Sequence, residues 1–344
     1  MAVGDSLGLP REGLSPRRAD RIFGSSPLHH RFFFGRGVLS DDTEHACLTG
    51  QALLAAPFDE KAFGSALAFR LRFWLAALPS AVGWGTLRSI LKLWIGFSPS
   101  RSGVVSAGNG AAMRAPVVGV CLAATPERIP AMMLASTSVT HRDPRAIQGA
   151  LAIALATAFV ARRPKGEFQW QALLDEIEPH LNHPELLSAL ASVRRCLERG
   201  DSPAQFAKEM GYEQGVSGYI VHTVAGALYC FLSNPLDFRG AVEAMILLGG
   251  DADTTGAIVG GLAGAARGAS EIPKEWLDGI MDMPFSVPWI RKLALRLFTT
   301  FSASPRASAP PGPTPLCWPL FPLRNFLFLW IVLVHGFRRM LPPY

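Results

Sequence analysis

Apolar residues recur at three- and four-residue spacing along most of this chain, and that period predicts α-helices. In residues 144–161 the side chains of Ile147 and Leu151 would share one helix face with later apolar residues. Asp143 is a natural cap for the start of this segment, and Pro144 suits the first helical position. Similar periodicity covers residues 43–55, 60–76, 186–198, 217–231 and 238–248. Alternating strand-like segments and hairpin turns are scarce, so we predict an all-α body.

Composition indicates a compact globular protein, because 49% of the residues are hydrophobic and only 17% are charged. The net charge of +6 is moderate, and Lys and Arg are spread without a dense basic run. This distribution does not favour a nucleic-acid partner, whereas it suits a phosphorylated small molecule or a modified protein. The five cysteines are far apart without a CxxC pair, and the start of the chain lacks the pattern of a secretory signal, so we expect a cytoplasmic protein.

The chain divides into three parts by composition. Residues 1–301 carry the helical periodicity and form the predicted all-α domain. Residues 302–315 are rich in Pro, Ala and Ser, a composition that predicts an extended linker. Residues 316–344 form an apolar C-terminal tail.

Two interpretations of the tail stay open. Its uninterrupted apolar run at residues 326–334 is much shorter than the roughly 20 residues that a membrane-spanning helix needs. A helix in the membrane interface is one interpretation, with Arg324, Arg338 and Arg339 facing anionic lipid. The other is a final helix that docks on the body or on a second subunit.

The first motif with chemical content is SDDTEH, which begins at Ser40. Asp41 and Asp42, with the flanking hydroxyls, offer the oxygen ligands that hard divalent cations prefer. Taken alone, the same string is more typical of a helix N-cap followed by acidic residues in the first turn.

The second motif is GGDADTTGAIVGGLAGAARG, in which Asp251, Asp253 and Thr254 stand at a predicted loop-to-helix junction. An EF-hand is excluded, because Leu262 stands at the twelfth loop position, where that motif requires a bidentate Glu. Glycines then recur at every fourth position over residues 256–264, so we predict that another backbone approaches this helix face closely.

Together the two acidic motifs supply four carboxylates and several hydroxyls at two helix starts. The positive ends of helices disfavour cations, so a metal site between them needs such a surplus of acid. The motifs are sufficient to hold a pair of Mg²⁺ or Mn²⁺ ions.

Two shorter motifs indicate a ligand-binding surface. The turn SAGNGAAMRAP has glycines whose backbone NH groups are open to a ligand, and its candidate substrate-binding residues are Gly108, Asn109, Gly110 and Met113. The string THRDP places His141 just before a helix, in position to hydrogen-bond a phosphate or ribose oxygen. Each motif is weak alone, since glycine-rich turns are usually ordinary loops and a lone His is usually a polar surface residue.

The four motifs, in this order and at these separations, resemble those of the ADP-ribosylglycohydrolase family over roughly residues 4–268. The resemblance implies a single large orthogonal bundle of helices that binds two divalent cations. Carried over by position, it implies six metal ligands, which are Ser40, Asp41, Asp42, Asp251, Asp253 and Thr254. The N-terminal GDSLGLPREG is similar to a family segment whose acidic residue approaches the scissile ribose, and Glu12 is the matching residue here. The helix that normally precedes that segment is expected to be missing.

The implied activity is metal-dependent hydrolysis of the C1 glycosidic bond of ADP-ribose, on an ADP-ribosylated protein or a small ADP-ribose conjugate. Such a bond breaks through an oxocarbenium-like state, which positioned carboxyl groups and cations stabilise. The candidate catalytic residues are Glu12, Asp41, Asp42 and Asp251. The acceptor linkage is not readable from the sequence.

Two alternatives remain at this stage. A haloacid-dehalogenase-like phosphatase also has an apolar run followed by a motif like DADTT, although its nucleophile motif stands near the start of its domain and leads into alternating strands and helices. A catalytically silent relative that only binds ADP-ribose would keep the fold without turnover, although the complete set of candidate ligands argues against it.

Overall fold

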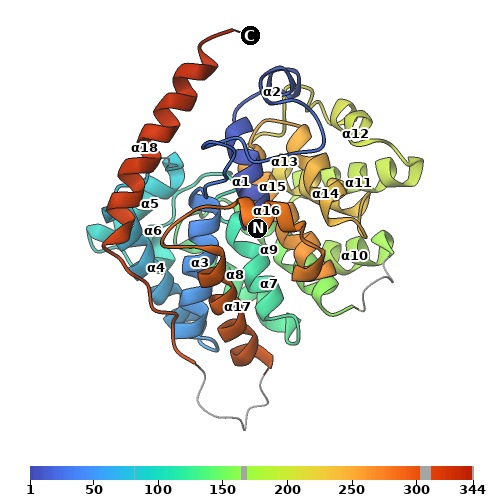
Figure 1. Cartoon of the computed structure of the whole chain (residues 1–344). Helices are drawn as coiled ribbons and strands as arrows, with labels where there is room; N and C mark the ends of the chain where they lie inside the picture. Colours follow the sequence, from blue (N-terminus) through green and yellow to red (C-terminus); the bar gives the residue numbers. More distant parts are fainter. Residues whose placement is uncertain (81, 164–168, 303–310, 343–344) are drawn as a thin grey trace.

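The computed structural model describes residues 1–80, 82–163, 169–302 and 311–342. These residues form α-helices α1 to α18 and short 3₁₀ helices, and within them the only β-type pairings are isolated bridges. The predicted all-α class is therefore confirmed (Figure 1).

The first nine helices are α1 (Ala2–Gly8), α2 (Pro16–Phe23), α3 (Asp41–Ala55), α4 (Glu60–Ala76), α5 (Trp84–Trp94), α6 (Pro99–Ser102), α7 (Ala115–Cys121), α8 (Ile129–Ser138) and α9 (Pro144–Ala161). The others are α10 (Trp170–Ile177), α11 (Pro184–Arg199), α12 (Pro203–Glu209), α13 (Ile220–Leu232), α14 (Phe238–Leu247), α15 (Ala252–Arg267), α16 (Lys274–Gly279), α17 (Val287–Ser302) and α18 (Leu320–Arg339).

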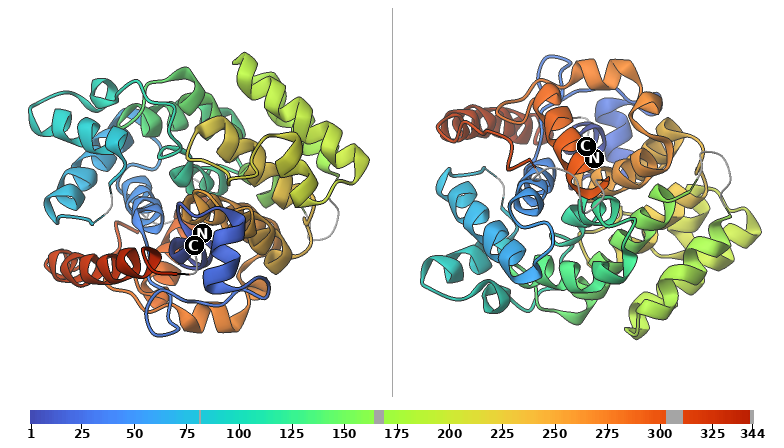
Figure 2. Two further views of the ribbon diagram at one scale, coloured as in Figure 1. Left: turned by 90° about the horizontal axis from the view of Figure 1, so that it is seen from above. Right: turned by 90° about the horizontal axis from the view of Figure 1, so that it is seen from below.

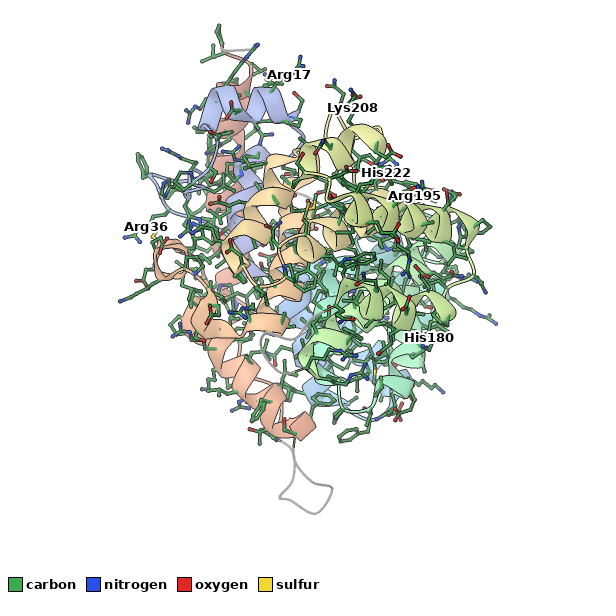
Figure 3. All side chains as sticks on the ribbon, turned by 90° about the vertical axis from the view of Figure 1, so that its right-hand side faces the viewer. Arg17, Arg36, His180, Arg195, Lys208 and His222 are labelled. Atoms are coloured by element: carbon green, nitrogen blue, oxygen red, sulfur yellow. The ribbon has the colours of Figure 1, made fainter. Side chains whose placement is uncertain are left out.

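Helix α9 occupies the centre of the body, where it packs against α7, α8, α13 and α15. Most of its residues are buried, and many are Ala, so that neighbouring helices approach it closely. Figure 2 shows α3 to α6 on one side of this centre and α10 to α14 on the other. Asp143 caps the helix through its bond from the Arg145 NH at 2.9 Å, and Pro144 follows, as the sequence predicts.

The start of the chain differs from the prediction. Residues 2–8 form helix α1, so the first part of the GDSLGLPREG segment is itself helical, whereas the sequence analysis expected no helix at this end of the domain. An isolated helix of this length is not stable in water. Packing of α1 along α15 supplies the missing stability, and local sequence patterns carry no information about that contact.

Glycines make the contact between α1 and α15 close. A Cβ atom on Gly4 would stand 1.9 Å from the carbonyl oxygen of Gly256, and one on Gly8 would stand 2.1 Å from that of Ala252. The sequence predicted that another backbone approaches the glycine-lined face of α15 closely. This is confirmed at Gly256 and Gly260, which face the backbone of α1 and its N-cap. A Cβ atom on Gly264 would have no α1 atom within 4 Å, and the ring of Phe238 would be its nearest neighbour outside the helix backbone, at 3.9 Å.

Helix α18 docks on the body near its two ends (Figure 1). Near its start, the Asn325 side chain donates to the carbonyl of Ala77, just after α4, at 2.8 Å, and at its end Arg339 donates to the carbonyls of Pro10 and Glu12. The docked-helix interpretation of the tail therefore describes this structure. Before the helix, Thr314 is buried and pairs with Gln51 through both of its backbone groups, at 2.7 and 2.6 Å. Part of the predicted linker, residues 303–310, lies outside the described residues.

The expected short apolar run of the tail is part of a 20-residue helix. Among the described helices, α9 and α18 are long and apolar enough to cross a membrane by length and composition alone. The apolar character of α9 is explained by its burial in the core, which reaches 72%, while α18 is 28% buried. The outer face of α18 exposes large side chains such as Phe326, Trp330 and Phe337. A membrane contact through this face, and a cytoplasmic location, stay predictions.

The close contact of α1 and α15 yields a stability prediction. Gly4→Ala should lower the free energy of unfolding by about 3 kcal/mol or more, because its methyl group would overlap a backbone carbonyl that cannot rotate away. Gly264→Ala is the matched control, since it adds the same group to α15 where no atom is closer than 3.9 Å. It should be neutral or stabilise by up to about 1 kcal/mol, through helix propensity. Urea denaturation of both variants tests this, and equal effects would contradict it.

Candidate active site

The two acidic motifs meet where helices α3 and α15 begin. The Thr254 hydroxyl donates to Asp42 Oδ2 at 3.1 Å, which joins the second motif to the first across more than 200 residues of sequence. The Ser40 hydroxyl donates to the same oxygen at 3.1 Å. Ser40 is also the N-cap of α3, and Asp251 occupies the N-cap position of α15. The structure thus brings together the residues that the sequence singled out as one cluster, which we call the acidic cluster: Glu12, Ser40, Asp41, Asp42, Asp251, Asp253 and Thr254.

Burial and mutual repulsion dominate the electrostatics of the acidic cluster. Burial raises the pKa of Asp42 well above its usual value, and the charges of Asp41 and Asp251 add to the effect. Burial likewise raises the pKa of Asp253, followed by the charge of Glu12. Desolvation also raises the pKa of Glu12 itself, while Arg339 opposes the shift. Bringing these carboxylates together therefore costs free energy unless protons or cations balance their charge.

Two observations bear on whether cations fit here. Asp42 Oδ1 is buried and has no hydrogen-bond partner, so this oxygen has its electron pairs available for a ligand such as a cation. Among the described residues, however, no three acidic, His or Cys side chains stand close enough to enclose a metal ion by themselves. An ion in this cluster would therefore take hydroxyl oxygens, from Ser40 and Thr254, as well as carboxylate oxygens.

Asp5 is a member of the site that the sequence analysis missed. Its buried carboxylate accepts bonds from the Ser40 NH at 3.0 and 3.1 Å and from the Thr43 NH at 3.2 Å, and also from the Thr43 hydroxyl. Burial raises its pKa to about 6, and these bonds oppose the shift. Asp5 thereby fixes the first turn of α3, which carries Asp41 and Asp42. Its place in the GDSLG segment, next to the matching Glu12, was the available signal.

The glycine-rich turn reaches the acidic cluster through Asn109. Its side-chain amide donates to Asp251 Oδ2 at 2.6 Å and to the Thr223 hydroxyl at 3.0 Å, so it orients Asp251. The Asn109 backbone NH donates to the Gly218 carbonyl at 3.0 Å and is not free to bind a phosphate, contrary to the role suggested for this turn. Asn109 therefore contributes through its side chain.

His141 lies beside the same turn. A Cβ atom on Gly110 would stand 3.1 Å from its ring, and one on Gly108 would stand 3.6 Å from Nε2, so the two glycines make room for the imidazole. Burial lowers the pKa of His141 to about 3, and the charge of Arg114 adds to this effect. The ring is therefore neutral at physiological pH. Contrary to the usual position of a lone His, it is buried.

Arg114 braces His141 and was also missed by the sequence analysis. The Thr140 hydroxyl accepts a bond from Arg114 Nη2 at 2.7 Å and contacts His141 Nδ1 at 2.9 Å. Burial lowers the pKa of Arg114 to about 9. Its neighbour Met113, a candidate substrate-binding residue, is buried with 3% of its surface exposed.

Glu44 and Arg324 complete the other side of the acidic cluster. Arg324, from α18, forms ion pairs with Glu44 at 3.0 Å and with Asp282 at 2.9 Å, and all three side chains are buried. The Trp74 indole donates to Glu44 as well. Burial raises the pKa of Glu44 to about 7, although Arg324 opposes the shift. Sequence reasoning considered Arg324 only within the membrane-interface interpretation of the tail and named no partner for it, because its partners are more than 40 residues away.

Comparisons with known proteins agree with this architecture. Residues 1–306 match the sequence model of the ADP-ribosylglycohydrolase family. An uncharacterized protein of Archaeoglobus fulgidus is 30% identical over 306 residues, which cover 87% of this chain and 93% of that protein. The ADP-ribosyl-[dinitrogen reductase] glycohydrolase of Rhodospirillum rubrum is 27% identical, over 81% of this chain and 86% of that enzyme. A solved structure of an ADP-ribosylglycohydrolase-related protein complex superposes with a TM-score of 0.63 at 27% identity, covering 86% of this chain and 93% of that one.

The family match and the similar enzymes identify an all-α enzyme of the class that hydrolyses ADP-ribose linkages. The chain belongs to the ADP-ribosylglycohydrolase family, as its motifs indicated.

The bond between α1 and α3 yields a second prediction. Thr43→Val keeps the side-chain shape but removes the hydroxyl that donates to Asp5, and it should cost about 1.5–3 kcal/mol at pH 7.5, where Asp5 is ionised. Because the pKa of Asp5 is about 6, the carboxyl is protonated below that value, so the cost should shrink at pH 5.

Thr49→Val is the control, since Thr49 is a buried residue of the same helix whose hydroxyl bonds back to the His45 carbonyl. It should cost less than about 1 kcal/mol at both pH values. Urea denaturation at the two pH values measures both variants. A pH-independent cost for Thr43→Val would contradict the role given to Asp5.

Proposed function

We propose that this chain hydrolyses the C1 glycosidic bond of ADP-ribose attached to a protein side chain or a small acceptor, and that the reaction needs two divalent cations, Mg²⁺ or Mn²⁺. The observation that carries the proposal is the acidic cluster, in which four aspartates and two hydroxyls from two helix starts converge next to Glu12. Family membership gives the reaction class, and the acceptor and the metals are the parts that require testing.

The candidate metal ligands are Ser40, Asp41, Asp42, Asp251, Asp253 and Thr254. The unpartnered Oδ1 of Asp42 and the surplus of buried carboxylates support this assignment. When bound, divalent cations would neutralise the cluster, bind ribose hydroxyls and lower the pKa of water.

The other residues position the substrate and its leaving group. Glu12 lies at the exposed rim of the cluster, and burial raises its pKa, which suits a carboxyl group that passes a proton to the leaving acceptor. Asn109 keeps Asp251 in place, and neutral His141 is available to donate a hydrogen bond from Nε2 when its Nδ1 accepts from Thr140. His141, Gly108, Gly110 and Met113 stay predictions as substrate-binding residues.

The phosphatase alternative loses its structural basis. A haloacid-dehalogenase-like nucleophile follows a β-strand, whereas the segment before Asp251 is helix α14. The silent binder differs from the proposal only in turnover, so the activity measurement below separates the two.

The first activity prediction concerns Asp251. The purified chain, incubated with Mg²⁺, should release free ADP-ribose from at least one arginine-, serine- or O-acetyl-linked conjugate, as measured by mass spectrometry. Asp251→Asn should reduce this turnover more than about 100-fold, since even the outer partners of metal ligands are worth roughly 10–100-fold. Asp175→Asn is the control, because that carboxylate is exposed on α10 and pairs only with surface groups. If Asp251→Asn were as active as the unaltered chain, Asp251 would have no role in the mechanism. If the unaltered chain bound ADP-ribose tightly but cleaved no conjugate, the catalytically silent relative would be the better description.

A further prediction concerns charge in the acidic cluster. Asp42→Asn should raise the melting temperature of the metal-free chain by about 2 °C or more, because it replaces a carboxyl group whose ionised form is disfavoured by burial and by the neighbouring charges. The same variant should lose the rise in melting temperature that Mg²⁺ or Mn²⁺ gives to the unaltered chain. Thermal unfolding with EDTA and with each metal measures both effects. A less stable variant that still responds to metal would show that Asp42 is a structural residue.

A further inference from the structure

A small cavity lies between the acidic cluster and helix α18. Its volume is about 140 Å³. One side is formed by cluster residues, including Glu12, Asp41 and Asp253, and the other by α18, including Phe328 and Val332. The C-terminal helix is therefore a wall of the candidate active site.

Side chains at both ends of α18 hold the helix in this place. Arg324, near its start, forms the buried ion pairs with Glu44 and Asp282 and donates to the carbonyl of Leu39, the residue before Ser40. Arg339, at its end, donates to the carbonyls of Pro10 and Glu12 at 2.9 Å each.

Between these ends, His335 stacks on Phe32 with ring centroids 4.4 Å apart and bonds to its carbonyl. Phe328 packs on the same ring, at 5.8 Å between centroids. Because breaking a buried ion pair is strongly unfavourable, these contacts describe a fixed wall rather than a loosely held segment.

The cavity and the glycine-rich turn meet different members of the acidic cluster. Asn109 reaches the cluster at Asp251, whereas the cavity borders Asp41 and Asp253. If the ADP-ribose lies along the turn, the acceptor on the far side of its C1 atom enters the cavity under α18. Pockets that enclose drug-sized molecules measure roughly 300–1,000 Å³, so a cavity of 140 Å³ has room only for a small group.

The wall lies outside the part of the chain that matches the family. The family match ends at residue 306, and α18 begins at Leu320. Because α18 covers one side of the acidic cluster, it limits which molecules can approach the cluster from that side. The part of the chain that matches the family does not include this barrier.

We propose that α18 determines acceptor size, so that the chain acts on free, small ADP-ribose conjugates in preference to ADP-ribose attached to folded proteins. This inference rests on the proposed function. A protein surface would have to occupy the space that α18 fills, whereas a single amino acid or an acyl group would not.

The test compares one linkage in two contexts. Arginine- and serine-linked ADP-ribose are each offered to the full chain as the free amino-acid conjugate and on a folded protein, and release of ADP-ribose is followed with Mg²⁺. We expect kcat/KM to be at least about 100-fold higher for the free conjugate, the ratio that about 2.7 kcal/mol of differential transition-state binding produces.

Phe328→Ala should lower this ratio at least about 10-fold by opening the wall, because Phe328 lines the cavity and is 5% exposed. Phe326→Ala is the matched control on the same helix, with a side chain that is 59% exposed and does not line the cavity, and it should leave the ratio unchanged. Val332→Ala, a smaller change in the same wall, replaces Phe328→Ala if circular dichroism shows that the latter does not fold.

The outcomes separate the two claims. If free and protein-linked conjugates are cleaved at similar rates, or if the Phe326 and Phe328 variants have the same ratio, α18 does not select the acceptor, and the proposed function still stands. If no conjugate is cleaved by any variant, the proposed function fails and this inference fails with it.

Discussion

Electrostatic repulsion within the acidic cluster is the constraint on which the rest of the structure depends. Helix dipoles at the starts of α3 and α15 favour negative charge, but burial and crowding still raise the pKa values of Asp41, Asp42 and Asp253. Two helix ends that carry such charges tend to separate. Packing elsewhere holds them together, above all the glycine-lined contact of α1 with α15 and the bonds from α3 to Asp5 on α1. The short helix α1 therefore holds the start of α3 next to the start of α15.

Local sequence patterns predicted most of the scaffold. The segments 60–76 and 144–161 are helices with those bounds, because their amphipathic period, caps and flanking residues all agree. The acidic motifs stand at helix starts, as predicted, because caps and first-turn acids are a local feature of the sequence. Their role as metal ligands stays a prediction. The glycine spacing in α15 predicted a close neighbour but could not name it as α1.

The remaining features depend on contacts between distant residues, which a period or a motif does not encode. Asp5 acts on a helix that begins more than 30 residues later, and Arg114 braces His141 through Thr140. The Asn109 backbone looked free in the sequence, yet Gly218 accepts its NH. A lipid-facing Arg324 was one of two open interpretations of the tail, and in the structure Arg324 instead pairs with the buried side chains of Glu44 and Asp282. In each case a polar group found a partner that only the tertiary fold supplies.

Helix α18 brings positive charge to the rim of the acidic cluster. After Asp282 the sequence contains no acidic residue, so this end of the chain adds only cationic side chains. Arg339 opposes the rise in the pKa of Glu12, and Arg324 opposes that of Glu44. The same residues that fix the wall therefore also offset part of the repulsion around the site. Acceptor access and charge balance are coupled through one helix, because any movement of α18 that widened the cavity would also withdraw positive charge from the carboxylates beside it.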